Sequence, residues 1–334
     1  MSSVASAIAP GTGTPTTGSG ARTAAVFAAC RAEGRAALVG YLPAGFPSVR
    51  GAVDALRALV DAGVDVLEVG LPYSDPVMDG PVIQRATERA LARGVRTRDV
   101  LATVEAVAAT GVPTLVMTYW NPVERYGVDA FARDLAAAGG AGLITPDLLP
   151  DHAGPWLAAA DDHGLDRVFL VSPSSTDARI AATAAASRGF VYATSVMGVT
   201  GARTATSSAA PRLVERVRAL GGLPVGVGLG VSDGDQAAEI GVFADGVIVG
   251  SALVRLLLAA DDDDDAGGAA AGGPTAGGTA AGGAAAGGTA GTRAGGAAPG
   301  GPTGGIAAVA ALASELVAGV RRGRRPAPAP APAP

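Results

Sequence analysis

Short runs of apolar, often β-branched residues recur along most of the chain and alternate with Ala- and Leu-rich segments at helical spacing. There are eight such runs, at residues 36–42, 64–70, 113–119, 141–146, 167–172, 190–195, 223–230 and 244–251. Strands that are apolar on both faces and separated by helices are typical of parallel sheets. Eight βα units predict an α/β fold with a single closed (β/α)8 barrel, a TIM barrel, and the alternative is an open doubly wound sheet.

Low-complexity segments flank and interrupt this pattern. Residues 1–22 and 261–305 contain almost no large apolar side chains, so they cannot offset the conformational entropy lost on ordering. The second segment begins with five aspartates and continues in Ala/Gly repeats, and residues 323–334 form a Pro/Ala tail. We therefore expect a disordered extension at 1–22 and a barrel at 23–322 that a flexible, solvated insertion at 261–305 interrupts. Roughly 250 residues then remain for the barrel, which is about the usual length of one.

Composition argues against several classes of function. The net charge is −5 and the basic residues are scattered, which gives a nucleic-acid partner little support. No basic stretch precedes an apolar segment at the N-terminus, and no run of about 18 apolar residues predicts a membrane span. The single cysteine, Cys30, permits no intrachain disulfide and fits a reducing compartment. We expect a cytoplasmic protein with neither a membrane nor a nucleic-acid partner.

The chain contains no lysine, because all 25 Lys and Arg residues are arginine. Schiff-base chemistry on a lysine amine is therefore excluded. The only histidines are His152 and His163, which argues against a multi-histidine metal site. We expect no metal in this chain.

Glu68 is the first candidate for chemistry, because active sites of such barrels lie at the C-terminal ends of the strands. It stands between Leu67 and Val69 in the second apolar run, where its neighbours predict burial. A buried carboxyl group is costly unless it is paired or protonated, and burial raises its pKa toward the range of a general acid/base. The alternative is a structural ion pair with an arginine.

Three loops after other strands carry further candidates. Asp75 and Asp79 follow the second run, although an acid in a loop is usually just solvated. Residues 197–208, MGVTGARTATSS, form either a mobile lid or an ordinary long loop. The glycines of GVGLGVSD (226–233) and GSALV (250–254) predict a phosphate site at a helix N-terminus, unless they serve only tight turns.

Several segments together resemble one family. They are LPAGFPS, EVGLPYSDPVMDGPVIQRA, MTYWNPVERYG, TPDLLP, GVTGART, GVGLGVS and DGVIVGSALV, which span about Ala36 to Val254. In order and spacing they resemble the α subunit of tryptophan synthase, and the second segment is the most specific. The resemblance implies a lyase of tryptophan biosynthesis that cleaves indole-3-glycerol phosphate to indole and glyceraldehyde 3-phosphate in a retro-aldol reaction, without a metal or cofactor in this chain.

The same resemblance assigns roles to particular residues. Glu68 matches the catalytic glutamate, which moves protons at C3 of the indole and at the side-chain hydroxyl. Asp79 matches the catalytic aspartate beside the ring N–H, where a negative charge offsets the developing iminium. The matching substrate-binding positions are Tyr41, Tyr192, Thr200, Gly201, Gly230, Gly250 and Ser251, with Thr200 on the lid.

The resemblance also implies a partner. Asp75, Pro76 and Asn121 match loops that face a β subunit, and we expect an α2β2 complex in which pyridoxal phosphate belongs to the β subunit. Two alternatives remain. One is another phosphate-binding barrel enzyme, such as a sugar-phosphate isomerase or indoleglycerol-phosphate synthase. The other is a catalytically weak barrel that mainly activates its β partner.

Overall fold

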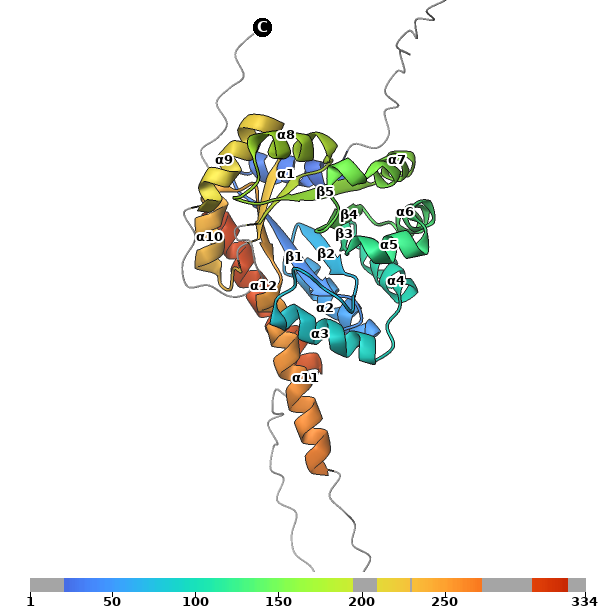
Figure 1. Ribbon diagram of the computed structural model, residues 1–334. Coiled ribbons are helices and arrows are strands. Elements are labelled where there is room, and N and C mark those ends of the chain that lie inside the picture. Colours follow the sequence, from blue (N-terminus) through green and yellow to red (C-terminus); the bar gives the residue numbers. More distant parts are fainter. Residues whose placement is uncertain (1–20, 195–208, 229, 272–301, 324–334) are drawn as a thin grey trace, which may run out of the picture.

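The strands form a closed parallel barrel in which each strand pairs with the next one in sequence and β8 returns to β1 (Figure 1). The computed structural model describes residues 21–194, 209–228, 230–271 and 302–323. The strands are β1 (Ala37–Pro43), β2 (Val66–Gly70), β3 (Thr114–Met117), β4 (Gly142–Thr145), β5 (Asp166–Val171), β6 (Val191–Thr194), β7 (Val225–Gly228) and β8 (Gly246–Val249). The prediction of eight strands in a closed barrel is confirmed, and the open sheet is excluded.

Helices surround the barrel and connect the strands. They are α1 (Arg22–Ala32), α2 (Val49–Asp61), α3 (Pro81–Ala92), α4 (Thr97–Ala108), α5 (Trp120–Tyr126), α6 (Val128–Ala137), α7 (Gly154–Asp162), α8 (Asp177–Ala186), α9 (Ala209–Gly221), α10 (Gly234–Phe243), α11 (Ser251–Ala271) and α12 (Pro302–Arg322), with a 3-10 turn at Pro150–His152. Helix α2 shows how the sequence sets both ends. The Ser48 hydroxyl caps its start by accepting the Gly51 N–H at 3.0 Å. Just past its end, Gly63 adopts a φ of 96°, which an L side chain would resist.

Helix α1 closes the N-terminal end of the barrel. The ring of Phe27 stacks on that of Phe190, at the start of β6, with 4.9 Å between ring centroids. Thr23 donates its backbone N–H (3.0 Å) and its hydroxyl (2.7 Å) to Asp166, the first residue of β5. Arg22, which we expected in the disordered extension, donates to two carbonyl groups before β4 and belongs to the barrel.

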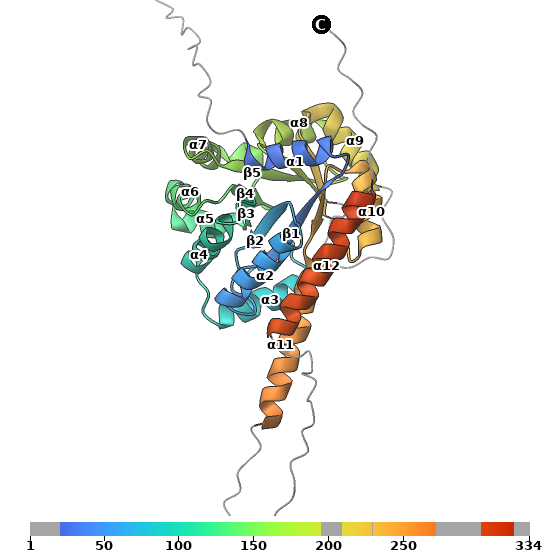
Figure 2. The same cartoon turned by 180° about the vertical axis from the view of Figure 1, so that it is seen from behind.

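Helix α12 completes the ring of helices on the side shown in Figure 2, where it runs along α10, α11 and α2. Its segment Thr303–Arg322 is long and apolar enough to cross a membrane. However, one side of the helix is buried against the barrel through Val309, Ala313, Leu316, Val317 and Val320. The Glu315 carboxylate also accepts the Gly234 N–H of α10 at 2.9 Å. These contacts show that α12 is apolar because it packs against the barrel.

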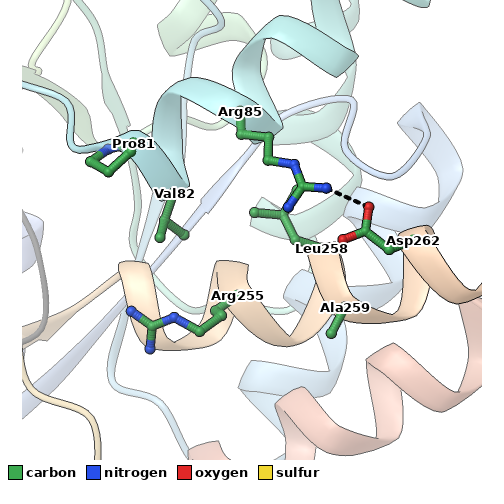
Figure 3. Close-up of a pocket in the computed structure, with 7 residues that line it drawn as sticks. All are labelled: Pro81, Val82, Arg85, Arg255, Leu258, Ala259 and Asp262. Carbon is green, nitrogen blue, oxygen red and sulfur yellow. Dashed lines mark hydrogen bonds and ion pairs between the residues drawn. The ribbon is translucent and has the colours of Figure 1, made fainter.

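The expected start of the flexible insertion, at Asp261, differs from the structure. Helix α11 continues to Ala271, and Asp261 is only 8% exposed. Asp261 pairs with Arg89 at 2.5 Å and with Arg93 at 3.0 Å. Asp262 pairs with Arg89 at 2.5 Å and with Arg85 at 2.6 Å, the pair drawn in Figure 3. We call these five residues the α3–α11 ion cluster.

The ion cluster explains why composition misled the prediction. Residues four apart lie on one face of a helix, so Arg85 and Arg89 of α3 and its C-cap residue Arg93 form a row of cations. The aspartates that begin the low-complexity segment face that row and are neutralised, so α11 extends into the segment. At the other end, α12 begins at Pro302, before the expected boundary at 305.

We predict that Asp261→Asn destabilises the barrel. The substitution leaves Arg89 and Arg93 without their shared carboxylate, and a hydrogen bond to a charged group contributes roughly 1.5–3 kcal/mol. Because the arginines are partly solvated, we expect about 1–2 kcal/mol in the free energy of unfolding and a Tm lower by a few degrees. Thermal unfolding followed by circular dichroism measures this.

The matched control is Asp263→Asn, because Asp263 is exposed and forms no ion pair in the described part of the chain. The difference in Tm between the two variants should shrink only slightly as salt is added, because Asp261 is buried and salt screens partly buried pairs much less than exposed ones. Equal Tm values for the two variants in low salt would show that the ion cluster does not stabilise the fold.

Candidate active site

Glu68 occupies the centre of β2 and is 1% exposed. The strand register places it beside Tyr41 of β1 on one side and Leu115 of β3 on the other. Alternate residues of a strand point to the same face, and Val66, two positions earlier, belongs to the cluster that fills the barrel interior. The carboxyl group of Glu68 therefore lies inside the barrel, in the half nearer the C-terminal ends of the strands.

The environment of Glu68 favours its protonated form. Burial is the main cause, the negative charge of Asp79 adds to it, and together they raise the pKa of Glu68 to about 8. No arginine pairs with Glu68 among the described residues, and its Oε2 atom has no hydrogen-bond partner there. The alternative of a structural ion pair thus finds no support. A buried carboxyl oxygen without a partner and with a shifted pKa is typical of a functional site.

Asp79 lies in the loop between β2 and α3, close enough to Glu68 to affect its pKa. The Tyr119 hydroxyl donates to the Oδ1 atom of Asp79 at 3.1 Å, and the Gln84 side chain donates to the Asp79 main-chain carbonyl at 2.8 Å. Burial raises the pKa of Asp79, and the bond from Tyr119 acts in the opposite direction. Asp79 is therefore a partly buried carboxyl group fixed by hydrogen bonds, and not a freely solvated loop acid.

Tyr41 of β1 lies beside Glu68, and Tyr192 of β6 is buried close enough to Glu68 to feel its charge. Burial raises the pKa of both tyrosines well above the usual value, and the charge of Glu68 contributes in each case. Glycine makes room for their rings. A Cβ at Gly228 of β7 would lie 2.5 Å from the Tyr192 hydroxyl, and one at Gly250 would lie 3.0 Å from the Tyr41 ring. Tyr41 and Tyr192, the two predicted substrate-binding tyrosines, thus lie in the barrel interior with Glu68.

The predicted phosphate positions lie at the ends of the adjacent strands β7 and β8. Gly230 follows β7 with a φ of 72°, and Gly250 follows β8. The Gly250 carbonyl accepts the Val254 N–H, so α11 begins here and the N–H groups of its first turn lack partners within the helix. Such a helix start, at Ser251, suits an anion. Thr200 and Gly201, also predicted to bind substrate, lie outside the described residues.

The predicted partner-facing residues lie in loops at the same end of the barrel. Asp75 is exposed and accepts a hydrogen bond from the Ser74 hydroxyl at 2.6 Å. Pro76 precedes Val77, an apolar side chain that is 71% exposed. Asn121, at the start of α5, is exposed and donates to the Tyr73 hydroxyl at 3.1 Å. The loops after β2 and β3 therefore meet directly.

Tyr119 was not predicted as a functional residue, although it touches Asp79. Its signal was present in the sequence, because it ends the third apolar run in the segment MTYWNP. A polar aromatic residue at the C-terminal end of a barrel strand is a candidate on position alone. The reach of its hydroxyl across to the loop after β2 required the structure.

The site brings together two acidic groups, two tyrosines and a helix N-terminus, and this set suits proton transfer on a substrate with a phosphate group. No group of three or more His, Cys, Asp or Glu side chains that could hold a metal ion occurs within residues 21–194, 209–228, 230–271 and 302–323. The chemistry available from these residues is acid/base and electrostatic.

Comparison with known proteins identifies the family. Residues 27–270 match the family described as "Tryptophan synthase alpha chain". The tryptophan synthase α chains of Mycobacterium marinum and Salinispora tropica are 67% and 68% identical over 236 residues, which cover 71% of this chain and 88% of each relative. The solved structure of Mycobacterium tuberculosis tryptophan synthase superposes with a TM-score of 0.75 at 55% identity, over 90% of this chain and 99% of that one. The chain therefore belongs to the tryptophan synthase α-chain family.

Proposed function

We propose that this chain cleaves indole-3-glycerol phosphate to indole and glyceraldehyde 3-phosphate in tryptophan biosynthesis. The observation that carries the proposal is the carboxyl group of Glu68, which is buried, pairs with no cation among the described residues, has a pKa raised to about 8 and lies near Asp79. A retro-aldol cleavage needs both a proton donor and a proton acceptor, and one carboxyl group that is protonated at neutral pH can serve as each in turn.

Glu68 acts first as an acid and then as a base. Its protonated carboxyl gives a proton to C3 of the indole, which places positive charge on the ring nitrogen. The carboxylate then takes the proton of the side-chain hydroxyl as the carbonyl forms. The bond between C3 and the side chain breaks, and its electron pair returns to the ring. Glu68 ends each cycle protonated, as it began, so the raised pKa keeps it ready for the next substrate.

Asp79 stabilises the intermediate. Its carboxylate lies beside the ring N–H, where its negative charge offsets the positive charge created by protonation at C3. The aromatic rings of Tyr41 and Tyr192, which pack against the strand-end glycines, flank the indole. The substrate phosphate binds between Gly230, Gly250 and Ser251, with Thr200 and Gly201 of the preceding loop closing over it.

The chain works with a β subunit, with Asp75, Pro76 and Asn121 at the contact, in an α2β2 complex. Pyridoxal phosphate belongs to the β subunit, because this chain has no lysine that could hold it as a Schiff base. The exposed Val77 between the two loop acids, Asp75 and Asp79, supports a docking surface at this edge. The complex works in the cytoplasm.

A second reading is a catalytically weak barrel that mainly activates the β subunit. The proximity of Glu68 to Asp79, whose carboxylate is hydrogen-bonded to Tyr119, argues against it. A barrel that only activates its partner does not need a buried carboxyl group that lacks a cation. Another phosphate-binding barrel enzyme is opposed by the match to the α-chain family over residues 27–270. Release of indole by the purified chain from indole-3-glycerol phosphate separates these functions directly.

We predict that Glu68→Gln abolishes nearly all cleavage while the fold and phosphate binding remain. The amide is close to the carboxyl in shape but cannot exchange the proton, and such positioned groups contribute roughly a hundred- to ten-thousandfold in rate. Steady-state indole release measures the rate, and calorimetry with glycerol 3-phosphate measures binding. More than about a tenth of the wild-type rate would remove Glu68 from the acid/base role.

We predict that Glu68→Gln stabilises the protein increasingly as pH rises. The pKa of Glu68 is raised in the folded state to about 8 from an ordinary 4.5, so its contribution to stability is complete below pH 4.5 and is lost as pH rises toward 8. The glutamine variant does not lose this stability, because its side chain does not ionise. Its Tm should therefore exceed that of the wild type by a margin that grows between pH 5 and pH 8 and then levels off.

The matched control for this titration is Glu105→Gln, because Glu105 is exposed on α4. Its Tm should follow that of the wild type at every pH. In the wild type, kcat/KM should also fall above about pH 8, as Glu68 loses the proton that C3 needs. A rate that rises through this range would mean that Glu68 starts the reaction as a base.

We predict that the chain cleaves its substrate slowly alone and at least tenfold faster with the cognate β subunit, which corresponds to about 1.4 kcal/mol in the activation free energy of cleavage. A partner on the loop of Asp75 and Pro76 also positions Asp79, and contact that differs between two states suffices to shift their populations. Indole release with and without the β subunit measures this. Thr200→Val measured under both conditions shows whether the lid takes part, and equal rates with and without partner would contradict the coupling.

A further inference from the structure

We propose that Tyr119 is a positioning residue for Asp79: its hydroxyl fixes one carboxylate oxygen so that the other faces the indole N–H. This inference rests on the proposed function, because it assigns Tyr119 a task only if Asp79 is the group that stabilises the charged ring. It adds a residue from the end of β3 to the catalytic site, and it connects that site to the proposed contact with the β subunit.

The hydroxyl of Tyr119 accepts one hydrogen bond and donates another, and both involve the loop after β2. The Met78 backbone N–H donates to this hydroxyl at 3.0 Å, so the oxygen already acts as an acceptor. The hydroxyl in turn donates to the Oδ1 atom of Asp79 at 3.1 Å. The two bonds fix the direction of the O–H, because a hydroxyl has a single proton to donate. The loop after β2 is thus tied twice to one side chain from the end of β3.

Tyr119 is itself well placed for this task. It is 5% exposed and immediately precedes α5. The backbone N–H of the next residue, Trp120, donates to the carboxylate of Asp147 at 2.9 Å, which anchors the start of the helix. On the outer side, the ring of Tyr73 packs on that of Tyr119 with 5.4 Å between centroids. A ring held by its backbone and by a neighbouring ring can orient a carboxylate more firmly than a loop can.

The bond from Tyr119 also favours the ionised form of Asp79. Burial raises the pKa of Asp79 and the bond from Tyr119 lowers it. The other titratable groups that face Asp79 are Glu68 of β2 and Tyr41 of β1, and neither is a cation. Among the described residues, Tyr119 is therefore the group that offsets burial, and without its hydroxyl Asp79 would hold its proton to higher pH.

The same ring connects Asp79 to the docking edge. Asn121, a predicted partner contact, donates to the hydroxyl of Tyr73, and the ring of Tyr73 packs on Tyr119. A partner that binds Asn121 thus touches a residue that three successive contacts connect to the Asp79 carboxylate.

The test is Tyr119→Phe, which removes only the hydroxyl. We expect kcat/KM for indole-3-glycerol phosphate to fall roughly ten- to a hundredfold, the size of one hydrogen bond to a charged group. The acid limb of the kcat/KM profile should move to higher pH, because Asp79 keeps its proton longer once the bond from Tyr119 that lowers its pKa is removed. A merely structural role would lower Tm without moving this limb.

The matched control is Tyr126→Phe. Tyr126 also donates its hydroxyl to an aspartate, Asp134, at 2.7 Å, but on the outer surface. Its kcat/KM and acid limb should equal those of the wild type. If Tyr119→Phe behaves like Tyr126→Phe in both rate and pH profile, Tyr119 does not position Asp79. The measurement is made for the chain alone and for the complex with the β subunit, and the loss should appear in both.

A double-mutant cycle separates this inference from the proposed function. In the Asp79→Asn background, Tyr119→Phe should cost less than about twofold, because Tyr119 acts only through the lost carboxylate. If Asp79→Asn itself turns over normally, the role of Asp79 fails and the proposed mechanism with it. If Asp79→Asn is impaired but the two substitutions multiply independently, the mechanism stands and the positioning role of Tyr119 is overturned.

Discussion

The described part of the barrel interior gives the carboxyl group of Glu68 neither a cation nor solvent, and the rest of the site is arranged around that desolvation. Burial of a charged carboxylate is costly, so the group holds its proton. Tyrosines beside it, and not arginines, preserve this state, since their hydroxyls are neutral and their own ionisation is suppressed. The strand-end glycines follow from the same need, because they give the tyrosine rings space inside a closed barrel.

Two acids of similar intrinsic strength acquire different behaviour from their surroundings. Glu68 sits on a rigid strand in an apolar chamber, whereas Asp79 sits on a loop and receives a hydrogen bond from Tyr119. The charge on Asp79 then raises the pKa of Glu68 further, so ionisation of one acid favours protonation of the other. Environments that push two titratable groups apart in this way allow one to carry a proton while the other carries a charge.

The sequence predicts the barrel well, because its evidence is local and repeated. Each strand is a buried run and each run precedes a helix, so eight repeats identify the fold without any long-range information. The burial of Glu68 also follows from its apolar neighbours. The hydrogen bond from Tyr119 to Asp79 does not, because it joins residues 40 positions apart through a loop geometry that no pattern encodes. The pairing of Asp261 with Arg89 was hidden for the same reason, since composition describes a segment without its surroundings.

The α3–α11 ion cluster also bears on how this chain tolerates change. It holds α11 against α3 ahead of residue 272, and α12 docks on α10 and α2 through its own buried side chains. The described contacts that fix the positions of α11 and α12 are thus made by residues outside 272–301. Doubling the length of a connection costs only about 0.6 kcal/mol in closure entropy. The junction between α11 and α12 is therefore a natural entry point for extra sequence, such as a tag or a whole foreign domain.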